Sequence, residues 1–375
     1  MKSLTHHLLD DRCAFVGTSG SGKTVAAKTM VEDLLDTGAR VAIVDPIGVW
    51  WGMTSDATGT KPGYKLVIFG GRQADIQITE TAGAAVGAMV GKGSFSCIVD
   101  LSELPHQAKR RRFMKDFAEA LYAANRESLH LVLDEADLWA PQKPMEDIAA
   151  VLGARIDEIV RRGRVRGFIP WLITQRPAVI HKDVLSQLDS LIALKLTSSQ
   201  DRNALDAWIE GQADKAEQRR IYAELPKLPV GKAVIWSPGH GILQEHQFRM
   251  IRTFDSSRTP KRGEKLKQAT KRAEVDIDAM RAELATVTAE AEANDPRALK
   301  ARIGDLERKL AQAPAAGPDK AELSRLQQEA WTDGFRTGQQ DLLTDFGVRL
   351  GAAVDAEAAM NKSLAVLEDW LDRAK

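Results

Sequence analysis

A glycine-rich stretch near the start of the 375-residue chain has residue types suited to binding phosphate. The candidate nucleotide-binding residues are Gly17, Thr18, Ser19, Gly20, Ser21, Gly22, Lys23, Thr24 and Val25. The first eight match the P-loop pattern of Gly, four residues and Gly-Lys-Thr at every fixed position. Glycines let successive backbone N–H groups point at phosphate oxygens, and a following helix adds its positive end. We therefore predict a nucleoside triphosphate site here.

The surroundings of this stretch support the prediction. Residues 13–16 before it form a short apolar run suited to a buried strand, and residues 25–35 after it have the spacing of an amphipathic helix. In such a strand–loop–helix unit, Lys23 would bridge the β- and γ-phosphates and the Thr24 hydroxyl would hold Mg²⁺.

A pair of acidic residues, Asp134 and Glu135, follows the apolar run 129–133 and has the form of a Walker B strand end. Asp134 would act on the Mg²⁺ side of the site, and Glu135 would polarise the attacking water as general base. Asp45 and Asp100 also end apolar runs and compete for the Mg²⁺ role. Neither is followed by Glu, so we rank both lower and expect Asp45 to shape the nucleotide pocket.

Gln175 ends a further apolar run, residues 168–174. An amide at that position would sense the γ-phosphate or orient the lytic water, but it is equally compatible with an ordinary strand cap.

Arginines are dense just before that run: Arg155, Arg161, Arg162, Arg164 and Arg166. Such a group has three interpretations: a solvated face, contacts to nucleic-acid phosphates, or an arginine that reaches a neighbouring subunit's active site. A second basic cluster, residues 109–112, is interpreted as a solvated face.

Eight near-continuous apolar runs predict the strands of an α/β fold: residues 13–16, 40–46, 64–69, 95–100, 129–135, 168–175, 191–196 and 233–236. Helical patterns between them, such as 108–124 and 145–160, indicate a mostly parallel sheet covered on both faces. We expect polar residues at the strand ends to meet at one edge, where such sheets bind ligands.

The composition changes after residue 255, which predicts an ATPase domain over 1–255, a linker over 256–263 and a helical coiled-coil tail over 264–375 with a hinge near 311–318. Apolar positions spaced by three and four form the predicted seams: Ile277, Met280, Leu284 and Val287; Leu299, Ile303, Leu306 and Leu310; Met360, Leu364, Leu367 and Leu371. We expect the tail to self-associate or bind a partner; packing of the stripe on the ATPase domain is the alternative.

Net charge is zero, so DNA contact would come from local patches rather than a global basic field. The two cysteines, Cys13 and Cys97, lie in apolar runs and are expected to be buried free thiols. No signal peptide, membrane span or Cys/His metal spacing is visible, so we expect a cytoplasmic protein with no membrane partner.

Taken in order, the P-loop, Asp134-Glu135-Ala136 and Ile173-Thr174-Gln175-Arg176-Pro177 resemble the HerA/FtsK group of P-loop ATPases, closest to the HerA-like proteins of bacteria and archaea. The resemblance covers residues 12 to 200 well. It implies a RecA-like core, hexameric rings, ATP between subunits and DNA in the pore. It also implies a sensor role for Gln175 and a trans-acting role for Arg161 or Arg164, with Arg161 preferred.

One departure from the archaeal-type motor matters: the P-loop begins too early for an N-terminal β-barrel that docks a nuclease. We therefore expect partner docking to have moved to the tail. The expected function is Mg²⁺-dependent ATP hydrolysis that drives a hexameric translocase on duplex DNA. The alternative is an ATP-gated scaffold that recruits an effector, such as a nuclease, through the tail, as in a defence or mobile-element system.

Overall fold

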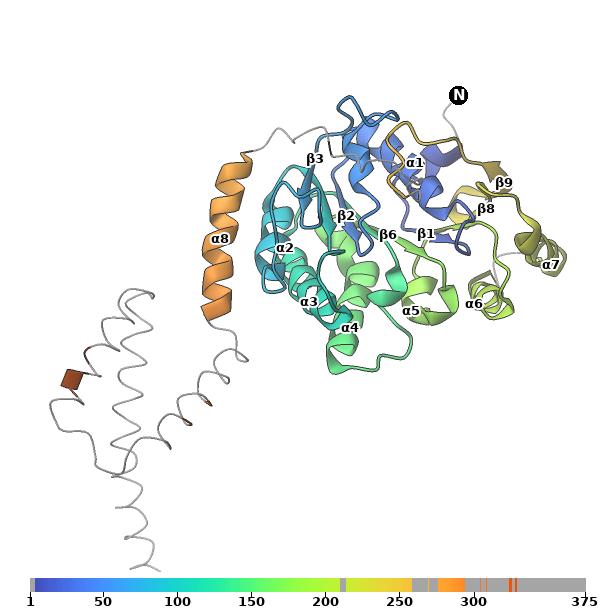
Figure 1. Cartoon of the computed structure of the whole chain (residues 1–375). Helices are drawn as coiled ribbons and strands as arrows, with labels where there is room; N and C mark the ends of the chain where they lie inside the picture. The colour runs from blue at the N-terminus through green and yellow to red at the C-terminus, as the bar shows by residue number, and fades with distance from the viewer. Residues whose placement is uncertain are drawn as a thin grey trace, which may run out of the picture. The chain divides into compact units, whose positions relative to one another are not determined.

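A computed structural model describes residues 4–209, 214–257, 269 and 276–293, together with the single positions 304, 308, 324, 325 and 328 (Figure 1). By internal packing the chain divides into two units, Met1–Leu299 and Lys300–Lys375. Nearly all described residues belong to the first unit.

Within the described residues, nine strands form one sheet in the order β3-β4-β2-β5-β6-β1-β7-β8-β9. The strands are β1 (Cys13–Val16), β2 (Val41–Asp45), β3 (Leu66–Phe69), β4 (Ser96–Asp100), β5 (Leu129–Leu133), β6 (Phe168–Thr174), β7 (Ser190–Ala193), β8 (Lys232–Ser237) and β9 (Ile242–Gln247). Pairings from β3 to β7 are parallel, whereas β8 and β9 are antiparallel. The predicted α/β fold with a mostly parallel sheet is confirmed.

Strands β1 to β8 correspond to the eight predicted apolar runs, because strands covered on both faces consist of near-continuous apolar residues. Strand β9 was not predicted. Four of the six residues in its sequence, Ile-Leu-Gln-Glu-His-Gln, are polar, and all six are at least partly exposed at the edge of the sheet. An edge strand needs few apolar residues, so it leaves a weak sequence signal.

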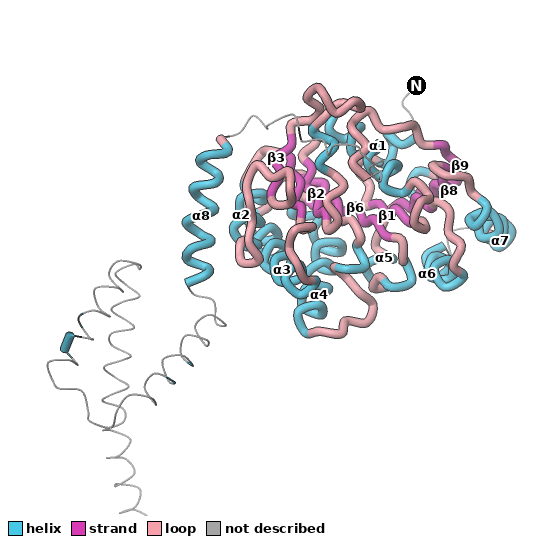
Figure 2. The backbone as a smooth tube through the Cα atoms, viewed as in Figure 1, coloured by secondary structure: helices cyan, strands magenta, loops and turns pink. Residues whose placement is uncertain are grey.

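Helices cover both faces of the sheet (Figure 2). They are α1 (Lys23–Asp36), α2 (Gly83–Lys92), α3 (Gln107–Ala124), α4 (Asp147–Arg162), α5 (Lys182–Ser186), α6 (Ser199–Ile209), α7 (Lys215–Glu224) and α8 (Ile277–Ala293). Helix α1 and the 3₁₀ turn η1 (Leu4–Leu8) pack on one face with Phe15 and Trp171, and α2, α3 and α4 pack on the other. Cys13 and Cys97 are buried free thiols, as predicted.

The contacts of Glu32 with Arg249, Arg252 and Thr253, called the Glu32 staple below, connect residues 249–253 to the P-loop helix α1. Glu32 of α1 is fully buried and accepts hydrogen bonds from the backbone of Arg252 and Thr253 and from the Thr253 hydroxyl. Arg249 and Arg252 pair with the same carboxylate at 2.5 and 3.3 Å. Residues 249–253 are therefore fixed against α1.

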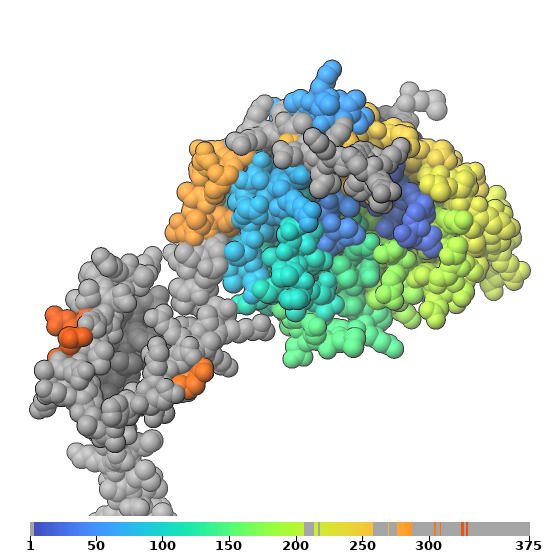
Figure 3. Space-filling model, viewed as in Figure 1, coloured from blue at the N-terminus to red at the C-terminus, as the bar shows by residue number. Residues whose placement is uncertain are grey.

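Helix α8 lies beyond the predicted linker and packs against α2 (Figure 3). Ile277 and Leu284 are buried in the same core cluster as α2, and Arg281 donates to the backbone carbonyl of Asp75. This part of the predicted seam therefore packs on the ATPase part of the chain, which is the alternative stated above to self-association or partner binding. The later seams and the hinge at 311–318 lie outside the described residues, so the coiled coil and the domain boundaries remain predictions.

Candidate active site

The P-loop connects the end of β1 to the start of α1. Gly20 and Gly22 have φ of 75° and 92°, in the left-handed region that favours glycine. A Cβ on Gly22 would lie 2.9 Å from the backbone nitrogen of Gly231, so the position also needs glycine for space. The loop is held from outside by Thr18, whose backbone N–H donates to the Lys195 carbonyl at 2.8 Å.

Three observations indicate that the loop fits a phosphate group. The Ser21 Oγ is buried and has no hydrogen-bond partner among the described residues. The 14-residue helix α1 begins at Lys23 with no side-chain cap on its first N–H groups. Lys23 itself is 7% exposed, so its charge is held inside the loop. Backbone donors, a buried hydroxyl and a cation together suit a triphosphate.

Three adjacent strands bring the predicted chemistry to one edge of the sheet. Strand β6 pairs with β1 on one side and with β5 on the other. The P-loop follows β1, Gln175 follows β6, and Asp134 and Glu135 follow β5. The carboxyl ends of parallel strands thus place Lys23, Asp134, Glu135 and Gln175 together. Thr24 and Val25 lie beside Lys23 in the first turn of α1.

Asp134 is buried and its carboxylate is held on both oxygens. Its Oδ1 accepts from the Glu135 backbone N–H and its Oδ2 from the Trp50 indole N–H, each at 2.9 Å. Each oxygen keeps a second lone pair free for the shell of a bound cation. Carboxylate and hydroxyl oxygens are the ligands that Mg²⁺ prefers, so Asp134 and Thr24 fit this ion.

Glu135 has an unusual backbone. Its φ of 46° makes it the only non-glycine residue with positive φ among those described. Burial raises the pKa of its carboxyl group, and the neighbouring charges of Asp134 and Asp137 act in the same direction, whereas Lys23 and the Gln175 amide oppose them. The Gln175 Nε2 donates to Glu135 Oε1 at 3.3 Å. Strained backbone at a polar edge is typical of functional positions.

The two competing acids are engaged in local structure. Asp45 is fully buried and accepts from four backbone N–H groups, those of residues 47 to 50. Burial, with Asp100 and Asp134 nearby, raises the pKa of Asp45 to about 7. Asp100 accepts from the Ser102 N–H at 2.8 Å. The four bonds to Asp45 fix the loop of residues 46–50. The ranking of both acids below Asp134, and a role of Asp45 in shaping the nucleotide pocket, remain predictions.

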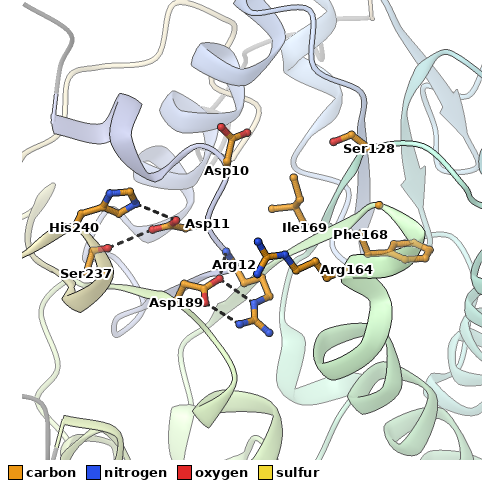
Figure 4. Close-up of a pocket in the computed structure, with 12 residues that line it drawn as sticks. Asp10, Asp11, Arg12, Ser128, Arg164, Phe168, Ile169, Asp189, Ser237 and His240 are labelled. Carbon is orange, nitrogen blue, oxygen red and sulfur yellow. Dashed lines mark hydrogen bonds and ion pairs between the residues drawn. The ribbon is translucent and has the colours of Figure 1, made fainter.

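The candidate trans arginines lie away from this edge. Arg164 lines a cavity of about 410 Å³ at the amino ends of the strands, together with Arg12, Asp189, Ser128 and His240 (Figure 4). Arg164 is exposed, and the negative charge of Asp189, which is paired with Arg12, lies near it. Arg161, in the last turn of α4, pairs with Asp157 at 2.7 Å and Asp183 at 3.2 Å. Neither arginine can reach the P-loop of its own chain, because both arginines lie at the amino ends of the strands and the P-loop lies at the carboxyl ends.

Arg12 was missed by sequence reasoning. It precedes β1, and its side chain makes two hydrogen bonds to Asp189, at 2.7 and 2.8 Å, while its backbone N–H donates a third at 3.0 Å. Figure 4 shows this pair beside Arg164. A partner 177 positions away leaves no local pattern, so only the fold reveals the contact.

The basic cluster at 109–112 is used within the fold. Lys109 and Arg112 both pair with Glu80, at 2.6 and 3.6 Å, and Arg111 pairs with Glu146 at 3.2 Å. Arg110 donates to the carbonyls of Leu104 and Ser102. Every member has a partner, so the cluster fastens the start of α3 to its surroundings.

The strand order, with one strand between the P-loop strand and the acidic strand, defines a RecA-like P-loop ATPase fold. Residues 121–330 match the family described as Helicase HerA-like C-terminal, and the chain belongs to this family. The match includes Asp134, Glu135 and Gln175, whereas the P-loop lies before it and rests on its own pattern and geometry.

Two curated relatives are similar to part of the chain. One is a probable DNA double-strand break repair helicase HerA of Methanocaldococcus jannaschii, 29% identical over 117 residues, which are 31% of this chain and 22% of that protein. The other is the DNA double-strand break repair helicase HerA of Pyrococcus furiosus, 26% identical over 157 residues, 38% of this chain and 27% of that protein. The chain therefore spans about a quarter of the length of the curated relatives it matches.

Among solved structures, the genome packaging NTPase of Sulfolobus turreted icosahedral virus 2 in complex with ATP-gammaS is 16% identical, with a TM-score of 0.41 over 64% of this chain and 97% of that one. VirB4 of Thermoanaerobacter pseudethanolicus is 13% identical, with a TM-score of 0.41 over 64% of this chain and 89% of that one.

Among the described residues, no helix is both long and apolar enough to cross a membrane. No group of three or more His, Cys, Asp or Glu side chains in the described ranges is arranged to hold a metal ion.

Proposed function

We propose that this protein hydrolyses ATP in an Mg²⁺-dependent reaction and uses the cycle to move along duplex DNA. The observation that carries the proposal is the meeting of three strand ends, which brings the P-loop, Gln175 and the Asp134–Glu135 pair to one edge. Family membership and the names of the HerA relatives support DNA as the partner.

The roles follow from position. Lys23 and the N–H groups of the P-loop would bind the phosphates, and Thr24 and Asp134 would hold Mg²⁺. The ion, when bound, neutralises negative charge on the β- and γ-phosphates. Glu135 would take a proton from the attacking water, and Gln175, which already donates to Glu135, would orient that water.

Completion of the site requires a second copy of the chain. The arginines lie at the amino ends of the strands and the P-loop at the carboxyl ends, so an arginine can contact the γ-phosphate only of a neighbouring subunit. We assign this trans role to Arg164 in preference to Arg161. Arg164 lies exposed beside a cavity, and the nearby Asp189 is already paired with Arg12, whereas Arg161 is itself paired twice. A closed ring of six copies is the assembly we propose.

Displacement of a triplex-forming oligonucleotide from duplex DNA tests movement directly. The wild-type protein with ATP and Mg²⁺ should release the third strand, and Lys23→Ala should not. Hydrolysis without displacement would instead favour the ATP-gated scaffold that recruits an effector through the tail.

A further inference from the structure

The loop after β2 is folded around one carboxylate. The Asp45 Oδ1 accepts from the N–H groups of Ile47 and Gly48 at 3.0 and 2.8 Å, and its Oδ2 accepts from those of Val49 and Trp50 at 2.7 and 2.8 Å. Four bonds to one buried group fix the backbone of this turn. The position of the Trp50 side chain is therefore determined by the fold rather than left to a mobile loop.

The Trp50 side chain lies between the two halves of the candidate active site. It is fully buried, and its Nε1 donates to Asp134 Oδ2 at 2.9 Å. On the other side, the Lys28 Nζ of the P-loop helix lies 5.7 Å from the centre of the indole ring. Lys28 is also fully buried and donates to the Val49 carbonyl at 2.6 Å. One side chain thus connects helix α1 to the end of β5.

We propose that Trp50 is a positioning residue for Asp134, which holds its carboxylate in the orientation that Mg²⁺ coordination requires. The last torsion of an Asp side chain is broad, so an unrestrained carboxylate rotates. The indole N–H only donates, and together with the Glu135 N–H it fixes both oxygens while one lone pair on each stays free. The inference rests on the proposed function, because it assigns the ion to Asp134.

Lys28 strengthens this arrangement. A cation near the face of an indole ring is attracted by the ring's negative face, and it draws electron density from the ring, which makes the N–H a better donor. The same ammonium fixes the Val49 carbonyl, one residue before Trp50. We therefore expect Lys28 to act on the metal site through Trp50.

The test compares two buried tryptophans that both donate to residue 134. Trp139 is also fully buried, but its Nε1 donates to the Asp134 backbone carbonyl at 2.9 Å and not to the carboxylate. In full-length protein bound to a non-hydrolysable ATP analogue, Mn²⁺ affinity is measured by electron paramagnetic resonance. Trp50→Phe should weaken Mn²⁺ binding about 10- to 100-fold, the range found when a partner of a metal ligand is removed. Trp139→Phe should leave it within about twofold of wild type.

A second readout separates positioning from damage to the P-loop. Binding of a fluorescent ATP analogue in EDTA involves no metal and should be the same in Trp50→Phe and wild type. If Trp50→Phe does not fold, Lys28→Met serves in its place and should weaken Mn²⁺ binding in the same direction. Unchanged Mn²⁺ affinity in the folded variant, or equal losses in Trp50→Phe and Trp139→Phe, would overturn the inference. A wild-type protein that binds no nucleotide would instead overturn the proposed function.

Discussion

The amide nitrogen of Gln175 lies 3.3 Å from Oε1 and 3.4 Å from Oε2 of Glu135. The contact joins the ends of β6 and β5, strands that pair along their length but are 35 residues apart in the chain at their nearest ends. A donor held against the carboxylate orients the group that would accept the proton from the attacking water. In the proposed hydrolysis, Glu135 is the base and Gln175 is the neighbour that orients it.

Replacement of the base should separate binding from chemistry. Glu135→Gln keeps the size of the side chain and removes its ability to take a proton, so ATP binding should persist while turnover falls about 100-fold or more. Equilibrium binding and single-turnover hydrolysis measure the two separately. Brisk hydrolysis by this variant would remove Glu135 as the base.

The left-handed backbone of Glu135 predicts an inverted order of stability. Glycine is ordinarily less stabilising than alanine, but at φ of 46° a side chain costs about 1–2 kcal/mol. Glu135→Gly should therefore unfold at a higher urea concentration than Glu135→Ala, although both lack the base. The usual order, with alanine the more stable, would show that the backbone is not strained there.

The trans arginine is tested in mixed assemblies. Arg164→Ala should hydrolyse ATP about 1,000-fold more slowly alone, the scale on which such arginines act. Mixing it with Lys23→Ala subunits should restore activity, because each supplies what the other lacks. The neighbouring exposed Arg162 is the control, and Arg162→Ala should keep its rate. Rescue seen with Arg161→Ala and not with Arg164→Ala would move the role to Arg161.

The staple on Glu32 should contribute strongly to stability. Glu32→Ala leaves the buried donors of Arg252 and Thr253 without their acceptor and should lower the free energy of unfolding by about 3–5 kcal/mol. The exposed pair of Arg72 and Glu103, 2.9 Å apart, is the control. Glu103→Ala should cost no more than about 1 kcal/mol in the same urea titration. Equal losses in the two variants would contradict the structural role of the staple.

The parts of the site that were predictable are those with a local pattern. The P-loop and the Asp134–Glu135 pair each depend on a few consecutive residues after a buried strand, and both lie where the patterns placed them. The adjacency of β5, β6 and β1 is a property of the sheet, so the contact between Gln175 and Glu135 appears only in the fold.

What was missed depends on contacts distant in sequence. Trp50 reaches Asp134 across 84 positions, and Arg12 reaches Asp189 across 177. An apolar residue in a loop gives no sign that its one polar atom is bound to an active-site carboxylate. The choice between Arg161 and Arg164 likewise depends on the partners that each arginine finds after folding.

Coupling of ATP hydrolysis to DNA is tested by the steady-state ATPase rate with and without duplex DNA. The rate is measured over a salt series from about 50 to about 200 mM, where phosphate contacts weaken steeply, with Lys23→Ala as the blank. A motor that moves on DNA should show strong stimulation by DNA at low salt, and this stimulation should fade as salt rises. A rate that is indifferent to DNA at the lowest salt would contradict the motor and leave an ATP-gated scaffold as the better description.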